Sequence, residues 1–547
     1  MRILCGDQAG EFLTPVTVEQ ALTALCPEQA KNALGAFRGG QPMELTETVR
    51  EDCVLTPITY GDEEGRRIYE RSLRFVLLLA VRRVLPGRHL RIEHSVGSGL
   101  YMRLLEEDVT EETAAKLQAE MEKIAAEDLP FVRESWTRER AIRYFEEEGE
   151  PDKTRLLAYR PYDFFQVYRC GGMAEYFYGL MLPSTGRVRC FRLLPYPPGV
   201  VLQLPDENDP SVPAAFVSRP RHMEIFRQSN RWCDMLECMN AADLNDMTVG
   251  GKMPEFIRIN EALHDSTIAQ IAAGICGKGA RAVFVAGPSS SGKTTFSNRL
   301  CIHLRVLGKR PRLISLDDFY RNREDLPLES DGKPDLEALD ALDVPCLREC
   351  LRQLLNGETA RMPRFDFNAQ KRCPQMEPMR LGETEILVME GIHGLNPKLH
   401  EGFDPALIAK VYISELTCLN LDNHNRIRTT DARLLRRIVR DHQFRGTPPE
   451  STIGMWDSVR RGEEKWIFPY QEEADFMFNS ALHYELPVLK RQVYDLLEAI
   501  PKDSPAYLRA SRLKKILHYI LPATDAALAE IPPLSLLREF IGGCTLY

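Results

Sequence analysis

The chain has 547 residues, of which 44% are hydrophobic and 27% charged, so it is neither a single small domain nor a disordered or fibrous protein. Its formal net charge is −9, which argues against a general nucleic-acid coat. The longest apolar run near the start, residues 75–81, is far shorter than the ~20 residues that span a bilayer. Asp7, Gln8 and Glu11 stand where a signal peptide needs an apolar stretch. We expect a soluble cytoplasmic protein of three or four domains, without membrane contact.

The 14 cysteines are scattered and form no CxxC pair. A chain of this length needs no disulfides to support its core, and zinc knuckles have a different spacing. We therefore expect Cys233, Cys238, Cys346 and Cys350 to be small core residues at near-helical spacing.

Two blocks precede a helical connector. The first block, residues 1–62, has short alternating segments and a helix-like stretch at 18–26, and it closes at a turn-rich sequence. The second block, residues 63–225, opens with an apolar helix at 69–84 that Pro86 and Gly87 end. A charged helix near 110–126 and aromatic strands between 156 and 203 follow. The connector, residues 226–279, is predicted to be helical.

The third block, residues 280–500, alternates between short apolar runs and helical patterns. Apolar runs without alternation are typical of strands buried on both faces, and we expect them at 282–286, 313–316, 386–389, 409–414 and 475–479. The clearest helical patterns lie between them, at 293–307, 343–356 and 431–442. This order predicts an α/β fold with a doubly wound parallel sheet that binds ligands at the carboxyl ends of its strands. A helical tail, residues 501–547, is broken at Pro532-Pro533.

The strongest motif is Gly287-Pro-Ser-Ser-Ser-Gly-Lys-Thr294, which satisfies GxxxxGK[ST] between a predicted strand and a predicted helix. Its glycines let backbone N–H groups surround phosphate oxygens, and the helix N-terminus adds positive potential. Lys293 would reach the β- and γ-phosphates, and the Thr294 hydroxyl would bind Mg²⁺. The sequence thus predicts an ATP–Mg²⁺ site that comprises Gly287, Ser289, Ser290, Ser291, Gly292, Lys293, Thr294 and Thr295.

Carboxylates end two of the predicted strands. Asp317 and Asp318 follow the strand at 313–316, and Glu390 ends the strand at 386–389. At these places a P-loop sheet can present a carboxylate to Mg²⁺ or to the attacking hydroxyl. We assign the chemistry to Asp317 and a turn to Asp318, with a helix cap as the alternative for the pair. A structural ion pair is the alternative for Glu390.

An arginine cluster extends from Arg426 to Arg461. Arg433, Arg437 and Arg440 fall on one helical face, and Arg445 is followed by a Ser/Thr/Pro-rich loop at 447–452. Because stacked like charges need an anion, we expect a lid that brings guanidinium groups onto the transferring phosphoryl group. A solvated helix and an RNA-binding patch are the alternatives.

The segment 364–372 places Phe365 and Phe367 on the same side of an extended strand, where a planar base could stack. A half-buried hairpin explains the same spacing equally well.

On these motifs the third block resembles the uridine kinase and phosphoribulokinase family of P-loop kinases. The resemblance implies that Lys293 and Asp317 act in catalysis, Asp317 as the base, and that Thr294, Asp317 and Glu390 surround the metal. Asp335, after Pro334, resembles the residue that holds the ribose hydroxyls. The family's lid arginines are similar to Arg436, Arg437, Arg440 and Arg445, the last three of which we predict to be catalytic.

The segment that contacts the base in that family departs from its pattern. Phe365, Phe367, Gln370 and Arg372 align with it, so a Tyr hydroxyl and a His are replaced by Phe and Gln. Thr447 stands where the family has a further lid arginine. We predict that Phe365, Phe367, Gln370 and Arg372 contact the acceptor together with Asp335.

The first two blocks resemble the N-terminal part of threonyl-tRNA synthetase. Residues 1–62 look like its TGS domain, a β-grasp fold, and residues 63–225 look like its α+β editing domain. The editing histidine and cysteine pairs are replaced by Arg71 with Phe75 and by Phe177 with Met181, so neither metal binding nor imidazole-assisted deacylation is expected. His94 is predicted to be a packed or capping histidine.

Together these features predict an ATP- and Mg²⁺-dependent kinase that phosphorylates a small-molecule hydroxyl, nucleoside-like and best matched by a nucleoside 5′-hydroxyl. One alternative is a sugar kinase similar to phosphoribulokinase. Another is an RNA- or ribosome-associated NTPase that binds its partner through the N-terminal modules. A homo-oligomer is compatible with all three.

Overall fold

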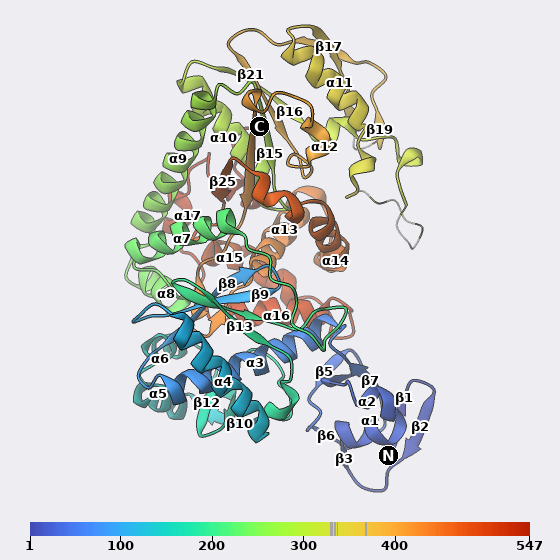
Figure 1. The fold of residues 1–547 in the computed structure, drawn as a ribbon, viewed down its shortest axis with the longest axis vertical. Helices are drawn as coiled ribbons and strands as arrows, with labels where there is room; N and C mark the ends of the chain where they lie inside the picture. The colour runs from blue at the N-terminus through green and yellow to red at the C-terminus, as the bar shows by residue number, and fades with distance from the viewer. Residues whose placement is uncertain (329–331, 333–334, 336, 367–368) are drawn as a thin grey trace.

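The computed structural model of the protein describes residues 1–328, 332, 335, 337–366 and 369–547. The third block occupies one end of the long axis and the first two blocks the other end (Figure 1). Among the described residues, no helix combines the length and the apolar character needed to cross a membrane.

The first block is a mixed five-stranded sheet with the order β2-β1-β7-β4-β5. Its central strands β1 (Arg2–Cys5) and β7 (Cys53–Ile58) are parallel, and their neighbours are antiparallel. Helix α1 (Val18–Leu25) packs on the sheet and begins with a capping box between Thr17 and Gln20. The other elements of this block are β2 (Gln8–Glu11), β3 (Val16–Thr17), α2 (Pro27–Ala30), β4 (Gly35–Arg38), β5 (Gln41–Met43) and β6 (Thr48–Val49).

One pair of cysteines differs from the expectation of small core residues. Cys5, at the end of β1, forms a disulfide with Cys26, directly after α1. The pairing was not predictable because the two residues meet only when α1 folds back over the sheet. Cys233, Cys238 and Cys350 are buried as predicted, and Cys346 is half-buried.

The second block is built around helix α3 (Glu63–Val84), which is buried along most of its length. It begins six residues before the predicted start because its first turns carry charged residues, such as Glu64 and Arg71, that pair inside the protein. Two antiparallel sheets pack with it, in the orders β13-β14-β9-β8 and β10-β11-β12. Their elements are β8 (Leu90–Val96), β9 (Gly99–Leu104), α4 (Glu111–Glu127), β10 (Val132–Thr137), α5 (Arg138–Glu147), α6 (Pro151–Ala158), β11 (Phe164–Cys170), β12 (Met173–Glu175), β13 (Arg192–Tyr196) and β14 (Gly199–Gln203).

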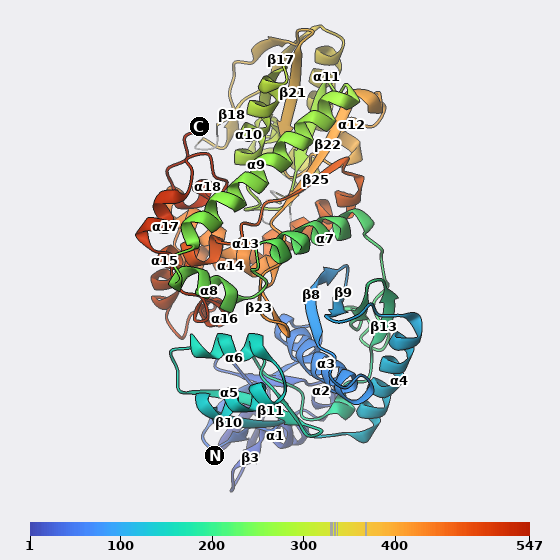
Figure 2. The same cartoon turned by 90° about the vertical axis from the view of Figure 1, so that its left-hand side faces the viewer.

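Three helices connect the second block to the third, α7 (Pro220–Met235), α8 (Ala241–Val249) and α9 (Met253–Lys278). Figure 2 shows α7 lying between the two halves of the molecule and α9 running along the third block. Helix α9 packs against α10 and β25, so the connector also covers one face of the sheet that follows.

The third block has the predicted parallel sheet, with the order β16-β21-β15-β22-β25. Its five strands occur where the apolar runs predicted them, as β15 (Ala282–Ala286), β16 (Arg310–Ser315), β21 (Glu385–Glu390), β22 (Ile408–Ser414) and β25 (Phe476–Asn479). The principal helices are α10 (Lys293–Val306), α11 (Val344–Leu355), α13 (Thr429–Arg445), α14 (Pro449–Trp466) and α15 (Glu485–Glu498). The prediction of an α/β fold with a parallel sheet is confirmed.

The loop predicted at 447–452 is much shorter. Helix α13 ends at Gly446, whose φ of +60° gives the left-handed C-cap, and α14 begins at Pro449. Proline is compatible with a first helical turn because the N–H that it lacks would have no partner there. The Pro-rich sequence is therefore a helix start, and only Gly446, Thr447 and Pro448 separate the two helices.

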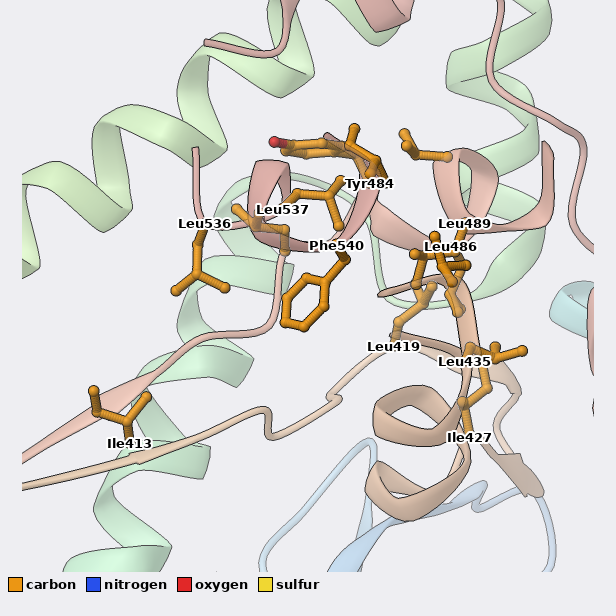
Figure 3. Packing of buried hydrophobic residues seen from close by; sticks show 14 of the residues in the cluster. Ile413, Leu419, Ile427, Leu435, Tyr484, Leu486, Leu489, Leu536, Leu537 and Phe540 are labelled. Atoms are coloured by element: carbon orange, nitrogen blue, oxygen red, sulfur yellow. The ribbon is translucent and has the colours of Figure 1, made fainter. Parts of the chain in front are cut away.

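The tail is an integral part of the core of the third block. After α16 (Tyr507–Leu517) and α17 (Asp525–Glu530), the chain breaks at the two prolines and forms α18 (Arg538–Ile541). Figure 3 shows Leu536, Leu537 and Phe540 of this last segment near Tyr484 and the other core residues of the cluster. The apolar side chains of the tail thus close a core that starts in the connector.

A hairpin of the third block, β23 (Asn420–Asp422) and β24 (Asn425–Arg426), inserts into the second block. The Ile92 N–H donates to the Asn423 carbonyl at 2.8 Å, and Arg428 pairs with Glu70 at 2.6 Å. At its tip, His424 lies against Lys153 and Glu175. We call this contact the junction.

Candidate functional site

The loop at 287–292 connects the central strand β15 to helix α10, and its shape depends on glycine. A Cβ on Gly287 would lie 2.0 Å from the Ile413 carbonyl oxygen, and Gly292 has a φ of +84°. The hydroxyls of Ser290 and Ser291 are buried and have no hydrogen-bond partner among the described residues. Unsatisfied buried hydroxyls at a helix N-terminus fit the oxygens of a phosphate group.

The sheet brings the predicted chemical residues to one edge. Val285 of β15 and Ser315 of β16 both pair in register with Glu390 of β21, so the three strands end together. The Thr294 hydroxyl lies 3.5 Å from Glu390 Oε1. Lys293 Nζ lies 3.2 Å from the Pro288 carbonyl oxygen.

The carboxylates of Asp317 and Glu390 are half-buried at this edge, and in the described part of the chain neither of them forms an ion pair. Burial raises the pKa of Glu390 to about 7, against the opposing charge of Lys293. Burial also raises the pKa of Asp317, which again feels Lys293. Two carboxylates and the Thr294 hydroxyl fit Mg²⁺, which keeps several water or phosphate ligands and needs few protein ligands. The described residues contain no cluster of three or more His, Cys, Asp or Glu side chains that could hold a metal alone.

Glu337 is a further carboxylate at this site that the sequence analysis missed. Burial raises its pKa to about 7, and it senses the charges of Glu463, Arg437, Lys293 and Asp317. It packs on Gly462 of α14, where a Cβ would lie 2.6 Å from the Glu337 Cβ. No local pattern marks Glu337, because only the packing of α14 brings it to this edge of the sheet.

The five arginines of α13 divide into two groups. Arg433 and Arg436 are almost fully buried and pair with Glu463 and Glu485. Arg433 also donates to the Ser289 carbonyl at 3.0 Å, and Glu463 accepts from the Ser289 N–H at 3.0 Å. The expected anion for these arginines is therefore supplied by the protein, and the resulting pairs hold the loop. Glu463 was not predicted, since its partner lies thirty residues earlier on another helix.

The other three arginines surround Asp441. Arg437, Arg440 and Arg445 lie 3.2, 2.9 and 3.4 Å from its carboxylate. Arg437 also donates to the Ser289 hydroxyl at 2.9 Å. Arg445 is more than half exposed, and its positive charge acts on Asp317. These arginines thus extend from the glycine-rich loop toward solvent.

The residues predicted to contact an acceptor lie in the segments after β16 and α11. Asp335 accepts from the Glu337 N–H at 3.1 Å, and the Phe365 ring lies 5.9 Å from that of Tyr320. Gln370 is exposed and accepts from Arg323 at 2.6 Å. Pro334 and Phe367 lie outside the described residues.

Arg372 is used by the protein itself. Its guanidinium donates to the carbonyls of Phe319 and Tyr320, both at 2.9 Å, and to Asp343 at 3.0 Å. These bonds hold the turn that carries Asp317 and Asp318. Asp318 accepts from the Phe365 N–H at 3.2 Å, which agrees with its assignment as a turn residue.

The tail reaches the first turn of α10. The Thr295 hydroxyl, which is fully buried, donates to Glu539 at 2.8 Å and lies 3.2 Å from the Tyr547 hydroxyl. Leu536 packs against Gly292. Residues separated by about 250 positions are thus in contact, and no local sequence pattern predicts this contact.

In the second block, the four positions that replace the editing pairs are buried. Arg71 donates to the Leu180 carbonyl at 2.8 Å, and the rings of Phe75 and Phe177 lie 6.3 Å apart. His94 stacks on Phe226, and burial lowers its pKa far below the usual value. It is the packed histidine that the sequence predicted.

Comparison with known proteins agrees with this division of the chain. Residues 282–486 match the phosphoribulokinase and uridine kinase family. The third block contains a domain of this family. That domain carries the loop at 287–292, both strand-end carboxylates and the arginines of α13, so the recognition made from these motifs is confirmed.

The N-terminal region matches threonine–tRNA ligases. The ligase of Symbiobacterium thermophilum is 34% identical over 186 residues, 34% of this chain and 29% of the ligase. That of Carboxydothermus hydrogenoformans is 33% identical over 191 residues, 35% of this chain and 30% of the ligase. The chain thus spans less than a third of the length of these relatives.

Two solved structures resemble the chain more weakly. One, described as a possible uridine kinase from Bacillus stearothermophilus, is 20% identical and covers 39% of this chain and 98% of its own, with a TM-score of 0.27. The other, a D-glycerate 3-kinase from Cryptococcus neoformans var. grubii, is 17% identical. The match covers 54% of this chain and 89% of the kinase chain, with a TM-score of 0.20. The family assignment therefore rests on the sequence match.

Proposed function

We propose that this protein is an ATP- and Mg²⁺-dependent kinase that phosphorylates a hydroxyl group of a nucleoside or a similar ribosyl compound. The single observation that carries the proposal is the meeting of Lys293, Thr294, Asp317 and Glu390 where three parallel strands end. An amine, a hydroxyl and two half-buried carboxylates in this arrangement match the requirements of phosphoryl transfer, which depends on positioning and electrostatics.

Each residue then has a defined task. The glycine-rich loop and Lys293 bind the phosphates of the nucleotide, and Thr294, Glu390 and Asp317 would hold Mg²⁺, which would neutralise charge on the phosphates. Asp317 would also accept the proton of the acceptor hydroxyl, because it directly follows β16 at the edge of the sheet that carries the phosphate loop. Arg437, Arg440 and Arg445 neutralise charge that develops during transfer.

For the acceptor we propose a nucleoside, held by the Asp335 carboxylate and the Phe365 ring. A carboxylate suits paired ribose hydroxyls, and an aromatic ring suits a planar base. Gln370 belongs to the same proposed pocket, and we propose that Arg372 positions Asp317 through the 319–320 carbonyls. A sugar kinase similar to phosphoribulokinase would use the same nucleotide residues with another acceptor.

The proposal is tested by incubating the full-length protein with Mg–ATP and panels of nucleosides and sugar phosphates, with ADP release and the phosphorylated product both measured. We expect product with at least one nucleoside, and competition by nucleosides only. Product from sugar phosphates alone would establish the sugar kinase instead. RNA-stimulated ATP hydrolysis without a phosphorylated small molecule would establish the NTPase.

For the first two blocks we propose a β-grasp module of the TGS type and a non-catalytic editing-like module. The parallel pairing of β1 with β7 and the helix across their sheet support the first assignment. Phe75 and Phe177 are buried and pack together where the editing residues would stand, which supports the assignment of a non-catalytic editing-like module. Contact with RNA or the ribosome through these modules remains part of this proposal, and so does a homo-oligomer.

A further inference from the structure

A cavity of about 210 Å³ lies between the second block and helix α16 of the tail. We call it the aromatic cavity, because seven rings line it: Tyr162, Phe165, Tyr168, Tyr176, Phe177, Tyr178 and Tyr519. Its lining also contains four basic residues, Arg133, Arg160, Lys515 and His518. Among the described residues that line it, none is Asp or Glu. In a chain with a net charge of −9, such a lining is selective for an anion.

Two of the basic groups keep their charge available. In the described part of the chain, neither Arg160 nor Lys515 forms an ion pair, whereas Arg133 pairs with Glu47 at 3.2 Å. The Arg160 guanidinium lies 4.8 Å from the centre of the Phe165 ring and 5.6 Å from that of Tyr519. It is thus held by rings and can still donate to a ligand.

The tyrosines present mainly ring surface to the cavity, because other groups take their hydroxyls. Tyr176 donates to Asp422 at 2.9 Å, and Tyr168 donates to the Glu44 carboxylate. The Tyr178 hydroxyl is buried beside that of Tyr519, with which Arg160 also interacts. The cavity therefore combines surfaces for a planar ring with two cations, Arg160 and Lys515, that no carboxylate of the described residues pairs with.

We propose that the aromatic cavity binds a planar aromatic ring that carries a phosphate, the chemistry of a nucleoside monophosphate. The ring packs among the tyrosines, and the phosphate is bound by Arg160 and Lys515. The cavity shares no lining residue with the site around Lys293. It is a second, separate ligand site.

Occupation of the cavity would hold α16 against the second block. Helix α16 also carries Arg512, which pairs with Asp431 of α13 at 3.1 Å, and Arg509, which pairs with Asp457 of α14 at 2.7 Å. Helices α13 and α14 in turn provide Arg433 and Glu463, which bind Ser289. A ligand in the cavity would thus be connected, through α16, to the helices that shape the glycine-rich loop.

The test measures binding of AMP and of UMP to the full-length protein by isothermal titration calorimetry. The nucleotide site is kept saturated with a non-hydrolysable Mg–ATP analogue, and an Asp335→Asn variant separates the cavity from the proposed acceptor pocket. We expect one site per chain that persists in this variant and that binds the unphosphorylated nucleoside at least ten-fold more weakly. Because binding and not turnover is measured, the outcome is independent of the proposed kinase activity.

The decisive variant is Arg160→Gln with Lys515→Gln, which removes both free cations without touching the buried rings. Lys514→Gln is the matched control, since Lys514 neighbours Lys515 on α16 but pairs with Glu498 at 2.8 Å and does not line the cavity. We expect the double variant to weaken binding at least ten-fold and the control to change it less than two-fold.

Absence of the site, equal loss in the control, or unchanged affinity in the double variant would overturn the proposal. Tighter binding of a short RNA than of either mononucleotide would replace it with an RNA-terminus site.

Discussion

Two lysines occupy opposite electrostatic environments in this protein. Lys153, at the junction, is completely buried and lies 2.7 Å from Glu175, beside His424. Lys293, at the glycine-rich loop, donates a hydrogen bond to the Pro288 carbonyl oxygen at 3.2 Å. Its interaction with the carboxylates of Asp317 and Glu390 is electrostatic, without an ion pair among the described residues. The first lysine is neutralised by the protein, whereas the second remains available to a ligand.

The carboxylates around each lysine show the same contrast. At the junction, burial alone would raise the pKa of Glu175, but Lys153 and His424 outweigh it and hold the pKa at about 2. At the loop, burial prevails and the pKa of Glu390 rises to about 7. Removal from water therefore has opposite consequences at the two places, because the junction is complete within the chain and the loop site is not. Perturbed groups without partners are typical of functional sites.

Replacing Lys293 should have the largest effect on activity. Lys293→Met removes the amine that we assign to the phosphates, while no buried carboxylate loses a paired partner. We expect turnover to fall by at least about three orders of magnitude, with a thermal midpoint within about 2 °C of the wild type. Steady-state ADP release and differential scanning calorimetry measure the two quantities. Near-normal turnover would remove the assigned role of Lys293.

Lys153→Met is the matched substitution at the junction, with the reverse pattern expected. It leaves Glu175 and Asp422 buried with His424 but without the lysine, and breaking a buried pair in this way costs about 3–5 kcal/mol. We expect the thermal midpoint to fall by several degrees and the turnover of the remaining folded protein to change less than about two-fold. A variant as stable as the wild type would show that the junction does not depend on this pair.

The junction should also weaken in acid. Glu175 and Glu70 both have a pKa of about 2 in the folded protein, below their usual 4.5, so the stability that they provide is complete above about pH 4.5 and is lost as the pH falls toward 2. Chemical denaturation between pH 6 and pH 3 measures this loss. In Lys153→Met the acid dependence should be smaller, because Glu175 has lost one of the charges that lower its pKa.

The smallest effect is expected where the tail meets α10. Glu539→Gln keeps the shape but replaces a charge-assisted hydrogen bond to the Thr295 hydroxyl with a neutral one, a change of about 1 kcal/mol. We expect a slight loss of stability and a change in the KM for ATP of less than about five-fold. Glu530→Gln, at the end of α17, is the control: its half-exposed carboxylate pairs with Arg258 at 3.4 Å, a surface pair that contributes at most about 1 kcal/mol and lies away from the nucleotide residues, so the KM for ATP should not change.

The local features of the third block were predictable because they depend on neighbours in sequence. Apolar runs predicted its strands within a few residues, and the spacing from Gly287 to Thr294 predicted the strand–loop–helix unit. The places of Asp317 and Glu390 followed from one rule, that parallel strands end at the same edge. The predictions were wrong where one local signal is compatible with two structures. The prolines after Gly446 can mark either a loop or the first turn of a helix, and here they begin α14.

Sequence by itself thus determined the class of fold, the family of the third block and the residues that form its phosphate loop, since each is encoded in periodicity or in a short motif. Only the tertiary structure decided which charges remain free. Whether a buried arginine is a structural partner, like Arg433 and Arg436, or is available, like Arg160, depends on carboxylates that approach from distant segments. The energy of a charge is set by its neighbours in space, and no periodicity along the chain records them.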